Sequence, residues 1–261
     1  MEAIKNQLAE NFGGVAHNLA SGSNAFSLDQ VPDLSGKVAL VTGGSEGIGF
    51  GATHTLLSHN IKKVYILTKT KEKADDAFAA IEEELGKGVR ERIDWRECDL
   101  QDWEHVASTA SDIAKNEERL DILINNAGRG IMTQQMSPAH GIDLHMACNH
   151  FGHVILTSHL MPLMKKTADQ NNIVRISCQS SSLHTSAPSD VAFASVDELQ
   201  KDYGPNAQYG RSKLANLLYA RWMAKNLTPT YPNILINATH PGIVDTAQTN
   251  DHIHEAFPIL G

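Results

Sequence analysis

Two residues of this chain have types and a spacing that could move a proton. Tyr209 and Lys213 are four positions apart, so on a helix they lie on one face, one turn from each other. A free phenol has a pKa of about 10 and is a poor acid–base group at neutral pH. A nearby ammonium group favours the phenolate and lowers that pKa, towards the range that suits general acid–base catalysis. Taken alone, the pair also fits an ordinary amphipathic helix with a surface lysine.

A glycine-rich turn, Thr42–Gly49, follows an apolar run and opens a helical stretch. In such a turn Gly43 allows a tight bend, Gly47 lets the backbone approach a pyrophosphate, and Gly49 lets the helix pack on the strand. The helix N-terminus adds free N–H groups and the positive end of its dipole. The turn therefore predicts a dinucleotide site, although a purely structural turn is the alternative. The predicted contacts in the turn are Gly43, Ser45, Gly47, Ile48 and Gly49.

The end of the second apolar run bears on the choice of dinucleotide. A site selective for NAD places an Asp or Glu about 20 residues after the glycines, where it bonds the ribose 2′-hydroxyl. Here the run ends in Thr68-Lys69-Thr70-Lys71, without an acid. A lysine attracts a 2′-phosphate and a carboxylate would repel it. The sequence thus predicts NADP(H), with contacts from Thr68 and Lys69, unless the lysines form a solvated cluster that selects nothing.

Short apolar runs alternate with helical stretches along the whole chain. The runs are Val38–Val41, Val64–Leu67, Ile93–Cys98, Ile122–Ile124, Ile173–Ile176 and Ile234–Asn237. One helical stretch follows the glycine turn and ends at about residue 60. The others cover 74–85, 103–115, 141–166 and 209–226. This alternation, with runs that are apolar on both faces, predicts an α/β protein with a doubly wound parallel sheet. We expect one domain over 37–261, preceded by a leader at 1–36 that contains a short helix.

Composition narrows the class of protein. The 261 residues carry a formal charge of −8, which argues against a nucleic-acid partner. The three cysteines and 13 histidines show no metal-binding spacing, so we expect free thiols and no metal site. Neither a signal peptide nor an apolar run of about 20 residues is present, so we expect a soluble, cytoplasmic protein without a membrane segment.

From Lys37 to about Thr246, five motifs in order resemble the short-chain dehydrogenase/reductase family. They are the TGxxxGxG turn, Asp99 after the third run, Asn125-Asn126-Ala127-Gly128, Tyr209-x-x-x-Lys213, and Pro241-Gly242-x-Val244-x-Thr246. Asn149–His153 and Ser212–Asn216 resemble the retinol-dehydrogenase-like branch, including its fungal members. The resemblance implies a Rossmann fold and hydride transfer between NADP(H) and a carbonyl or secondary alcohol of a small molecule, such as a lipophilic compound or natural product.

The resemblance also implies roles for individual residues. Tyr209 would exchange the proton, Lys213 would bond the nicotinamide ribose, and Asn149 would continue the relay through a water beside Lys213. The further cofactor contacts implied are Asp99, Leu100, Asn125, Asn126, Ala127, Gly128, Pro241, Gly242, Val244 and Thr246. A catalytically idle NADP(H)-binding protein is the main alternative, and a sugar-nucleotide epimerase or lyase on the same fold is a weaker one.

Two features depart from the family pattern. The family's serine follows the fifth strand, and an ungapped alignment puts Cys178 there, with Ser177 just before it. An alignment on the downstream S-x-x-H puts Ser181 there instead, and we favour Ser181, with Ser177 second and Ser180 also open. A thiol donates only weakly.

The second departure is the short stretch after the last motif, which ends at Gly261. Family members continue with a covering helical segment and a seventh strand. We therefore expect the usual last strand to be missing, 247–261 to be the only lid, and the sixth strand to be an unprotected edge. This makes a homodimer doubtful and favours the idle binding protein.

Overall fold

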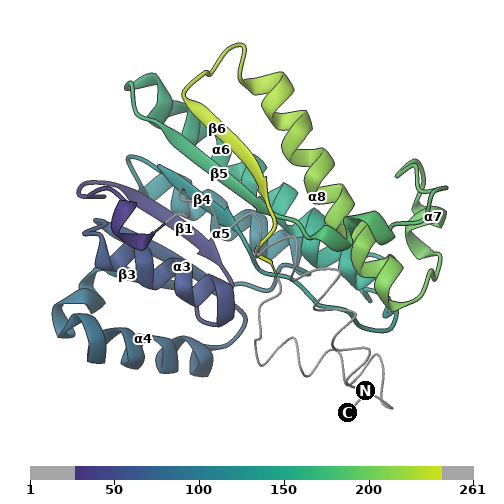
Figure 1. Cartoon of the computed structure of the whole chain (residues 1–261), viewed down its shortest axis with the longest axis horizontal. Helices are drawn as coiled ribbons and strands as arrows, with labels where there is room; N and C mark the ends of the chain where they lie inside the picture. Colours follow the sequence, from purple (N-terminus) through teal and green to yellow (C-terminus); the bar gives the residue numbers. More distant parts are fainter. Residues whose placement is uncertain (1–26, 243–261) are drawn as a thin grey trace.

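The computed structural model describes residues 27–242, and its central element is one parallel sheet (Figure 1). The strands are β1 (Val38–Thr42), β2 (Lys63–Thr68), β3 (Ile93–Glu97), β4 (Ile122–Asn125), β5 (Val174–Gln179) and β6 (Ile234–Thr239). They lie in the order β3-β2-β1-β4-β5-β6, and every neighbouring pair is parallel. The predicted doubly wound parallel sheet in a single domain is confirmed.

Helices cover both faces of this sheet because the strands are apolar on both. On β1, Val38 and Leu40 belong to one core, whereas Ala39 and Val41 belong to the other. One face carries α3 (Gly47–Ser58) and α4 (Lys71–Leu85), and the other carries α5 (Trp103–Asn116), α6 (His153–Asp169) and α8 (Pro205–Leu227). β1 and β2 therefore bury both rows of side chains, as parallel strands do, whereas β5 and β6 each leave one row partly or fully exposed.

The chain reverses its winding direction between β1 and β4, and this reversal opens a crevice. It runs outward from β1 through β2 to β3, then returns to β4 on the opposite side of β1. The loops after β1 and β4 consequently diverge at the carboxyl edge of the sheet, where ligands bind in open α/β sheets. The glycine turn follows β1 and the Asn125–Gly128 motif begins at the end of β4, so both reach this crevice.

The structure differs from the predicted elements mainly around residue 141. The predicted continuous helix over 141–166 is wrong at its start, because a π-helix, η4 (Met146–Gly152), precedes α6. A Cβ on Gly152 would lie 2.4 Å from the Leu100 carbonyl oxygen, so η4 approaches that loop as closely as a glycine allows. The short elements η2 (Leu28–Gln30), η3 (Lys87–Arg92), η5 (Ser182–Ser186) and α7 (Val196–Gln200) were not predicted.

Several terminal predictions fall beyond the described residues. The leader helix near Ile4–Phe12, the missing seventh strand and the lid at 247–261 lie outside them. Within them, Leu34 is buried beside α3 and donates its N–H to the His59 carbonyl, so the end of the predicted leader is part of the domain. No helix between residues 27 and 242 is long and apolar enough to cross a membrane.

Candidate active site

The glycine turn has the backbone that its sequence predicts. Gly43 and Gly47 have φ angles of +63° and +50°, which side-chain-bearing residues rarely adopt. The Gly43 N–H donates to the Leu67 carbonyl oxygen at 2.8 Å, and this bond anchors the turn to β2. A Cβ on Gly49 would lie 2.0 Å from the Gly43 carbonyl oxygen, so any side chain there would displace the turn. Ser45 is buried in the turn, and Ile48 lies in the first turn of α3.

Thr42 joins this turn to the loop after β4. Its Oγ1 accepts hydrogen bonds from the backbone N–H groups of Asn126 at 2.9 Å and Ala127 at 3.0 Å. The Asn126 side chain donates in return to the Thr42 carbonyl at 2.9 Å. Asn125 is buried and donates instead to Thr157 Oγ1 at 2.9 Å, so it braces β4 against α6. Two predicted cofactor loops are thus held side by side by Thr42, the first residue of the predicted turn, to which the sequence analysis assigned no role of its own.

Lys69, which is predicted to select the dinucleotide, forms an ion pair with Asp99, another predicted cofactor contact. Lys69 Nζ lies 2.9 Å from an Asp99 carboxylate oxygen, across the ends of β2 and β3. The Thr68 hydroxyl accepts from the Trp95 indole at 2.8 Å, and Leu100 is buried in the core. The Lys69 side chain is 60% exposed, so a 2′-phosphate could compete with Asp99 for it at modest cost.

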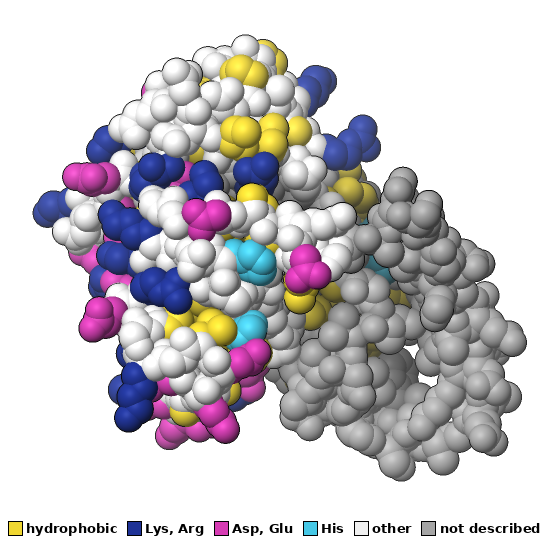
Figure 2. All heavy atoms as spheres, turned by 60° about the vertical axis from the view of Figure 1, so that its left-hand side comes forward, with side chains coloured by type: hydrophobic (Ala, Val, Ile, Leu, Met, Phe, Trp, Pro, Cys, Tyr) yellow, Lys and Arg dark blue, Asp and Glu magenta, His cyan; other side chains and the backbone are white. Residues whose placement is uncertain are grey.

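A second ion pair flanks the turn, because Lys73 on α4 lies 2.7 Å from the Glu46 carboxylate. Figure 2 shows that basic and acidic side chains are mixed on the face drawn there. That face therefore carries no large patch of side chains with one sign of charge.

Tyr209 and Lys213 lie on α8 with the Lys213 Nζ 5.4 Å from the centre of the phenol ring. Lys213 is only 3% exposed, and burial lowers its pKa to about 8. Its ammonium donates to the Gln179 carbonyl at the end of β5, at 3.2 Å. Burial raises the pKa of the Tyr209 phenol, and a hydrogen bond with Ser181 opposes that rise. The lowered phenol pKa expected from the spacing is therefore not present in the ligand-free site, where desolvation has the larger effect.

The four candidates for the serine position point in different directions. Ser181 hydrogen-bonds the Tyr209 phenol and caps η5 by accepting from the Leu183 N–H at 3.2 Å. Ser177 Oγ lies 3.2 Å from Thr239 Oγ1 on β6. Cys178 is buried in the core, and Ser180 donates to the Lys213 carbonyl at 2.8 Å. Of these four, Ser181 is the one that the structure brings to the tyrosine.

Asn149 lies inside η4 and is completely buried. Its side-chain oxygen accepts from the Arg129 N–H at 2.7 Å, and its amide nitrogen donates to the Arg129 carbonyl and to Ser212 Oγ, both at 3.0 Å. Its backbone carbonyl accepts from His153 Nδ1 and from Asn216 Nδ2, both at 3.0 Å. Both lone pairs of that carbonyl are therefore used by side chains. The role of Asn149 in a proton relay stays a prediction.

Arg211, between the two catalytic candidates, is fully buried although the sequence analysis assigned it no role. It donates to the Glu198 carbonyl at 2.7 Å and lies 3.4 Å from the buried Asp143 carboxylate. The bond to Glu198 attaches α7 to α8. The segment around 183–203 is thereby connected to the helix that carries Tyr209.

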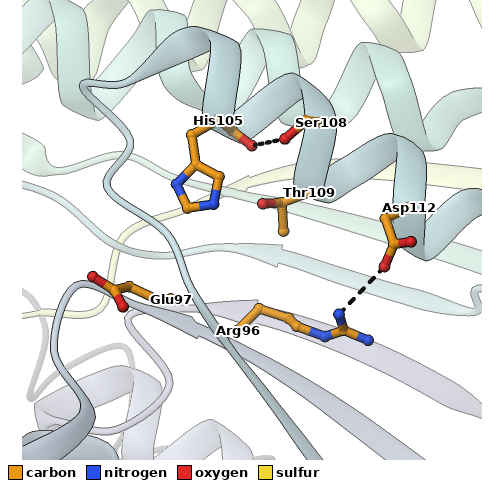
Figure 3. Close-up of a pocket in the computed structure, with 6 residues that line it drawn as sticks. All are labelled: Arg96, Glu97, His105, Ser108, Thr109 and Asp112. Carbon is orange, nitrogen blue, oxygen red and sulfur yellow. Dashed lines mark hydrogen bonds and ion pairs between the residues drawn. The ribbon is translucent and has the colours of Figure 1, made fainter.

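The last predicted contacts lie at the end of the described chain. Pro241 and Gly242 follow β6, with Gly242 at a φ of +82°, whereas Val244 and Thr246 lie outside the described residues. Elsewhere, a surface pocket between β3 and α5 is lined by Arg96, Glu97, His105, Ser108, Thr109 and Asp112 (Figure 3). It contains none of the predicted site residues, and its arginine is already paired with Asp112. All three cysteines are free, and residues 27–242 contain no cluster of three or more metal-ligand side chains.

Comparisons with known proteins identify the family of this chain. The family model for short chain dehydrogenase matches residues 37–256. One relative is a Neurospora crassa protein whose name reads oxidoreductase bli-4, mitochondrial, and it is 52% identical over all of this chain. Another is human retinol dehydrogenase 14, which is 33% identical over 87% of this chain. The chain spans 64% and 66% of the length of these two curated relatives. A short chain dehydrogenase structure from Escherichia coli CFT073, complexed with NADPH, is 25% identical, with a TM-score of 0.65 over 87% of this chain and 84% of that one.

Proposed function

Because this chain belongs to the short chain dehydrogenase family, we propose that it transfers a hydride between NADP(H) and a carbonyl or secondary alcohol of a small molecule. The observation that carries the proposal is the meeting of Tyr209, Ser181 and Lys213 at the carboxyl edge of the sheet, next to the glycine turn. An epimerase or lyase on the same fold is not favoured by any contact in the site.

In the direction of reduction, the substrate carbonyl oxygen accepts hydrogen bonds from the Tyr209 phenol and the Ser181 hydroxyl. NADP(H), when bound, would supply the hydride that the carbonyl carbon receives. Tyr209 then gives its proton to the developing alkoxide, which becomes the alcohol, and the resulting phenolate is stabilised by the Lys213 ammonium. In oxidation the phenolate takes the proton back. The Ser181 hydrogen bond opposes the rise that burial causes in the pKa of Tyr209, which favours this exchange.

The turn at Gly43–Gly49 would hold the pyrophosphate, and Lys69 the 2′-phosphate of NADP(H). Asp99 and Leu100 would border the adenine, and Lys213 would bond the nicotinamide ribose. The preference for NADP(H) rests on the exposed ammonium of Lys69 and the lack of an acid at that position. The Escherichia coli relative's complex with NADPH supports it by analogy.

The substrate is proposed to be small and lipophilic. The support is the resemblance to retinol dehydrogenase 14, whose name specifies a lipophilic alcohol. Residues 129–138 and 183–203 would form the walls of the substrate pocket. The buried bonds of Arg211 hold the second of these walls against α8.

A panel of carbonyls and alcohols, followed by NADPH absorbance, tests the proposal. Tyr209→Phe should abolish turnover of any substrate found and leave the NADPH dissociation constant within about threefold, because the phenol hydroxyl acts on the substrate. Ser181→Ala should lower kcat by about 10²-fold, in the range known for the loss of one polarising donor. Ser177→Ala is the matched control and should retain activity. NADPH binding without turnover across the panel would favour the idle binding protein.

The remaining predictions concern the whole protein. We propose a nucleotide-binding domain over 37–261 with a leader at 1–36, and a cytoplasmic location. The name of the Neurospora relative specifies mitochondria, so fractionation of cells that express the full-length protein separates the two compartments. Sedimentation of the purified protein tests whether it forms a homodimer.

A further inference from the structure

A chain of buried hydrogen bonds leads from the glycine turn to the Lys213 ammonium. Its first member, Thr42, precedes Gly43, and its Oγ1 lies 2.8 Å from His153 Nε2. The other ring nitrogen of His153, Nδ1, lies 3.0 Å from the Asn149 carbonyl. His153 is 3% exposed and the two residues that it joins are completely buried, so water cannot replace these bonds.

The partners determine which atoms carry protons. The Asn149 carbonyl can only accept, so Nδ1 of His153 carries the hydrogen and Nε2 accepts from the Thr42 hydroxyl. Thr42 Oγ1 is left with two lone pairs, which accept from the Asn126 and Ala127 N–H groups. Burial lowers the pKa of His153 to about 4, which agrees with a neutral ring at physiological pH.

Asn216 continues the chain on α8. Its amide nitrogen donates to the Asn149 carbonyl at 3.0 Å and to the Gln179 carbonyl at 3.1 Å. The Gln179 carbonyl is also the acceptor of the Lys213 ammonium. The amide oxygen of Asn216 lies 3.1 Å from His150 Nδ1, which fixes the orientation of the amide. Every polar atom of the Asn216 side chain therefore has a partner in the chain or beside it.

The Asn149 carbonyl belongs to the π-helix η4. The backbone N–H of His153, the residue that follows η4, donates to the His150 carbonyl. The Asn149 carbonyl accepts side-chain donors from both α6 and α8. π-helical turns of this kind are frequent at functional sites.

We infer that His153 and Asn216 are positioning residues that hold the Lys213 ammonium at a fixed separation from the glycine turn. This inference rests on the proposed function, because it assigns the turn to the pyrophosphate and Lys213 to the nicotinamide ribose. The two halves of NADP(H) must then be bound at once by elements from opposite sides of the β1–β4 crevice. A rigid connection between those elements avoids an ordering cost when the cofactor binds.

Two ligands separate this role from a general structural one. NADPH spans both ends of the chain, whereas adenosine 2′,5′-bisphosphate lacks the nicotinamide half and reaches only the turn and Lys69. His153→Phe keeps a ring but removes the hydrogen bonds to Thr42 and Asn149. Asn216→Leu removes the hydrogen bonds to the Asn149 and Gln179 carbonyls. Each variant should weaken NADPH binding about five- to tenfold, which is the effect of roughly one hydrogen bond. Each should leave binding of the bisphosphate within twofold.

Controls keep this test independent of stability. Thr167→Val removes a fully buried hydroxyl near the far end of α6, where it bonds Leu120 and Leu163. It should lower the Tm without changing either dissociation constant. His153→Asn keeps an N–H near the position of Nδ1 and should recover part of the NADPH affinity. All binding is measured well below the Tm, with circular dichroism to verify folding.

If a variant bound both ligands more weakly by the same factor, the defect would lie at the turn alone, and the inference would be overturned. Unchanged binding of both, with a lower Tm, would show a purely structural role and also overturn it. The wild-type protein could also bind the bisphosphate as tightly as NADPH. That result would show that Lys213 does not engage the nicotinamide half, and it would overturn the inference. A wild-type protein that binds neither would overturn the proposed function itself, and the inference with it.

Discussion

Replacement of Lys213 by methionine should make the protein more stable at neutral pH while it removes the proposed activity. The ammonium is 3% exposed and has no carboxylate partner among residues 27–242. Its one hydrogen bond is to the neutral Gln179 carbonyl. Methionine has a similar length and is readily accommodated in buried surroundings. The substitution thus removes a buried charge without opening a large cavity.

The size of the effect follows from the lysine's pKa. Burial lowers it from 10.5 to about 8, and at about 1.4 kcal/mol for each tenfold change in proton affinity this costs roughly 3 kcal/mol. The unfolded chain binds the proton more tightly than the folded one, so the cost is complete below pH 8 and disappears as pH rises to 10.5. Loss of the hydrogen bond to Gln179 costs about 1 kcal/mol of stability and offsets part of that gain. Lys213→Met should therefore gain about 2 kcal/mol at pH 7 and lose up to about 1 kcal/mol at pH 10.5, where mainly the loss of the hydrogen bond remains.

Urea unfolding of both proteins at several pH values between 7 and 10.5 measures this difference. Lys225→Met, at an exposed position on the same helix, is the control and should change the free energy of unfolding by about 0.5 kcal/mol or less at every pH. A Lys213→Met protein that is less stable than wild type at pH 7 would refute the reasoning. So would a stability difference that does not change with pH, because the buried charge would then not be its cause.

Three further outcomes test other parts of the site. Gly49→Ala should abolish NADPH fluorescence changes, because its Cβ would lie 2.0 Å from the Gly43 carbonyl oxygen; retained binding would mean that the turn is not the pyrophosphate site. Lys69→Ala should weaken NADPH binding at least fivefold and NADH binding hardly at all, and equal losses would remove the argument for the 2′-phosphate. The pKa of His153 is lowered by burial from 6.5 to about 4, so its neutral ring contributes stability above pH 6.5 that is lost as pH falls towards 4. That loss, roughly 3 kcal/mol, should be absent from the acid-unfolding curve of His153→Phe.

The sequence was sufficient for the sheet and for the glycine turn, because both depend on local signals. Apolar runs such as Val38–Val41 mark buried strands directly, and their alternation with helices predicts that the strands are parallel. Positive φ at Gly43 and Gly47 is a property of the chain near those residues. The alternation also placed the ends of β1, β4 and β5 at one edge, which brings the motifs together without any knowledge of side-chain contacts.

The position of the serine was harder to predict because it depends on where an irregular segment bends. After β5 the chain continues to pair with β6, as the Ser180 N–H donates to the Thr239 carbonyl. Ser180 then faces the backbone of α8, and only the next residue, Ser181, reaches the phenol. A sequence of consecutive serines carries no period that distinguishes these two. Alignment on the later S-x-x-H was the one available signal, and it predicted the serine that the structure brings to Tyr209.

The pKa of Tyr209 illustrates a different limit. Helical spacing correctly places Lys213 near the ring, yet it says nothing about how much water each group loses. Burial raises the phenol pKa and lowers that of the ammonium, so in the free protein both groups shift towards their neutral forms. A tyrosine–lysine pair is thus set by two opposing effects, of which only the Coulombic one can be read from spacing. It follows that the direction of the net pKa shift at Tyr209 depends on burial, which helical spacing does not report.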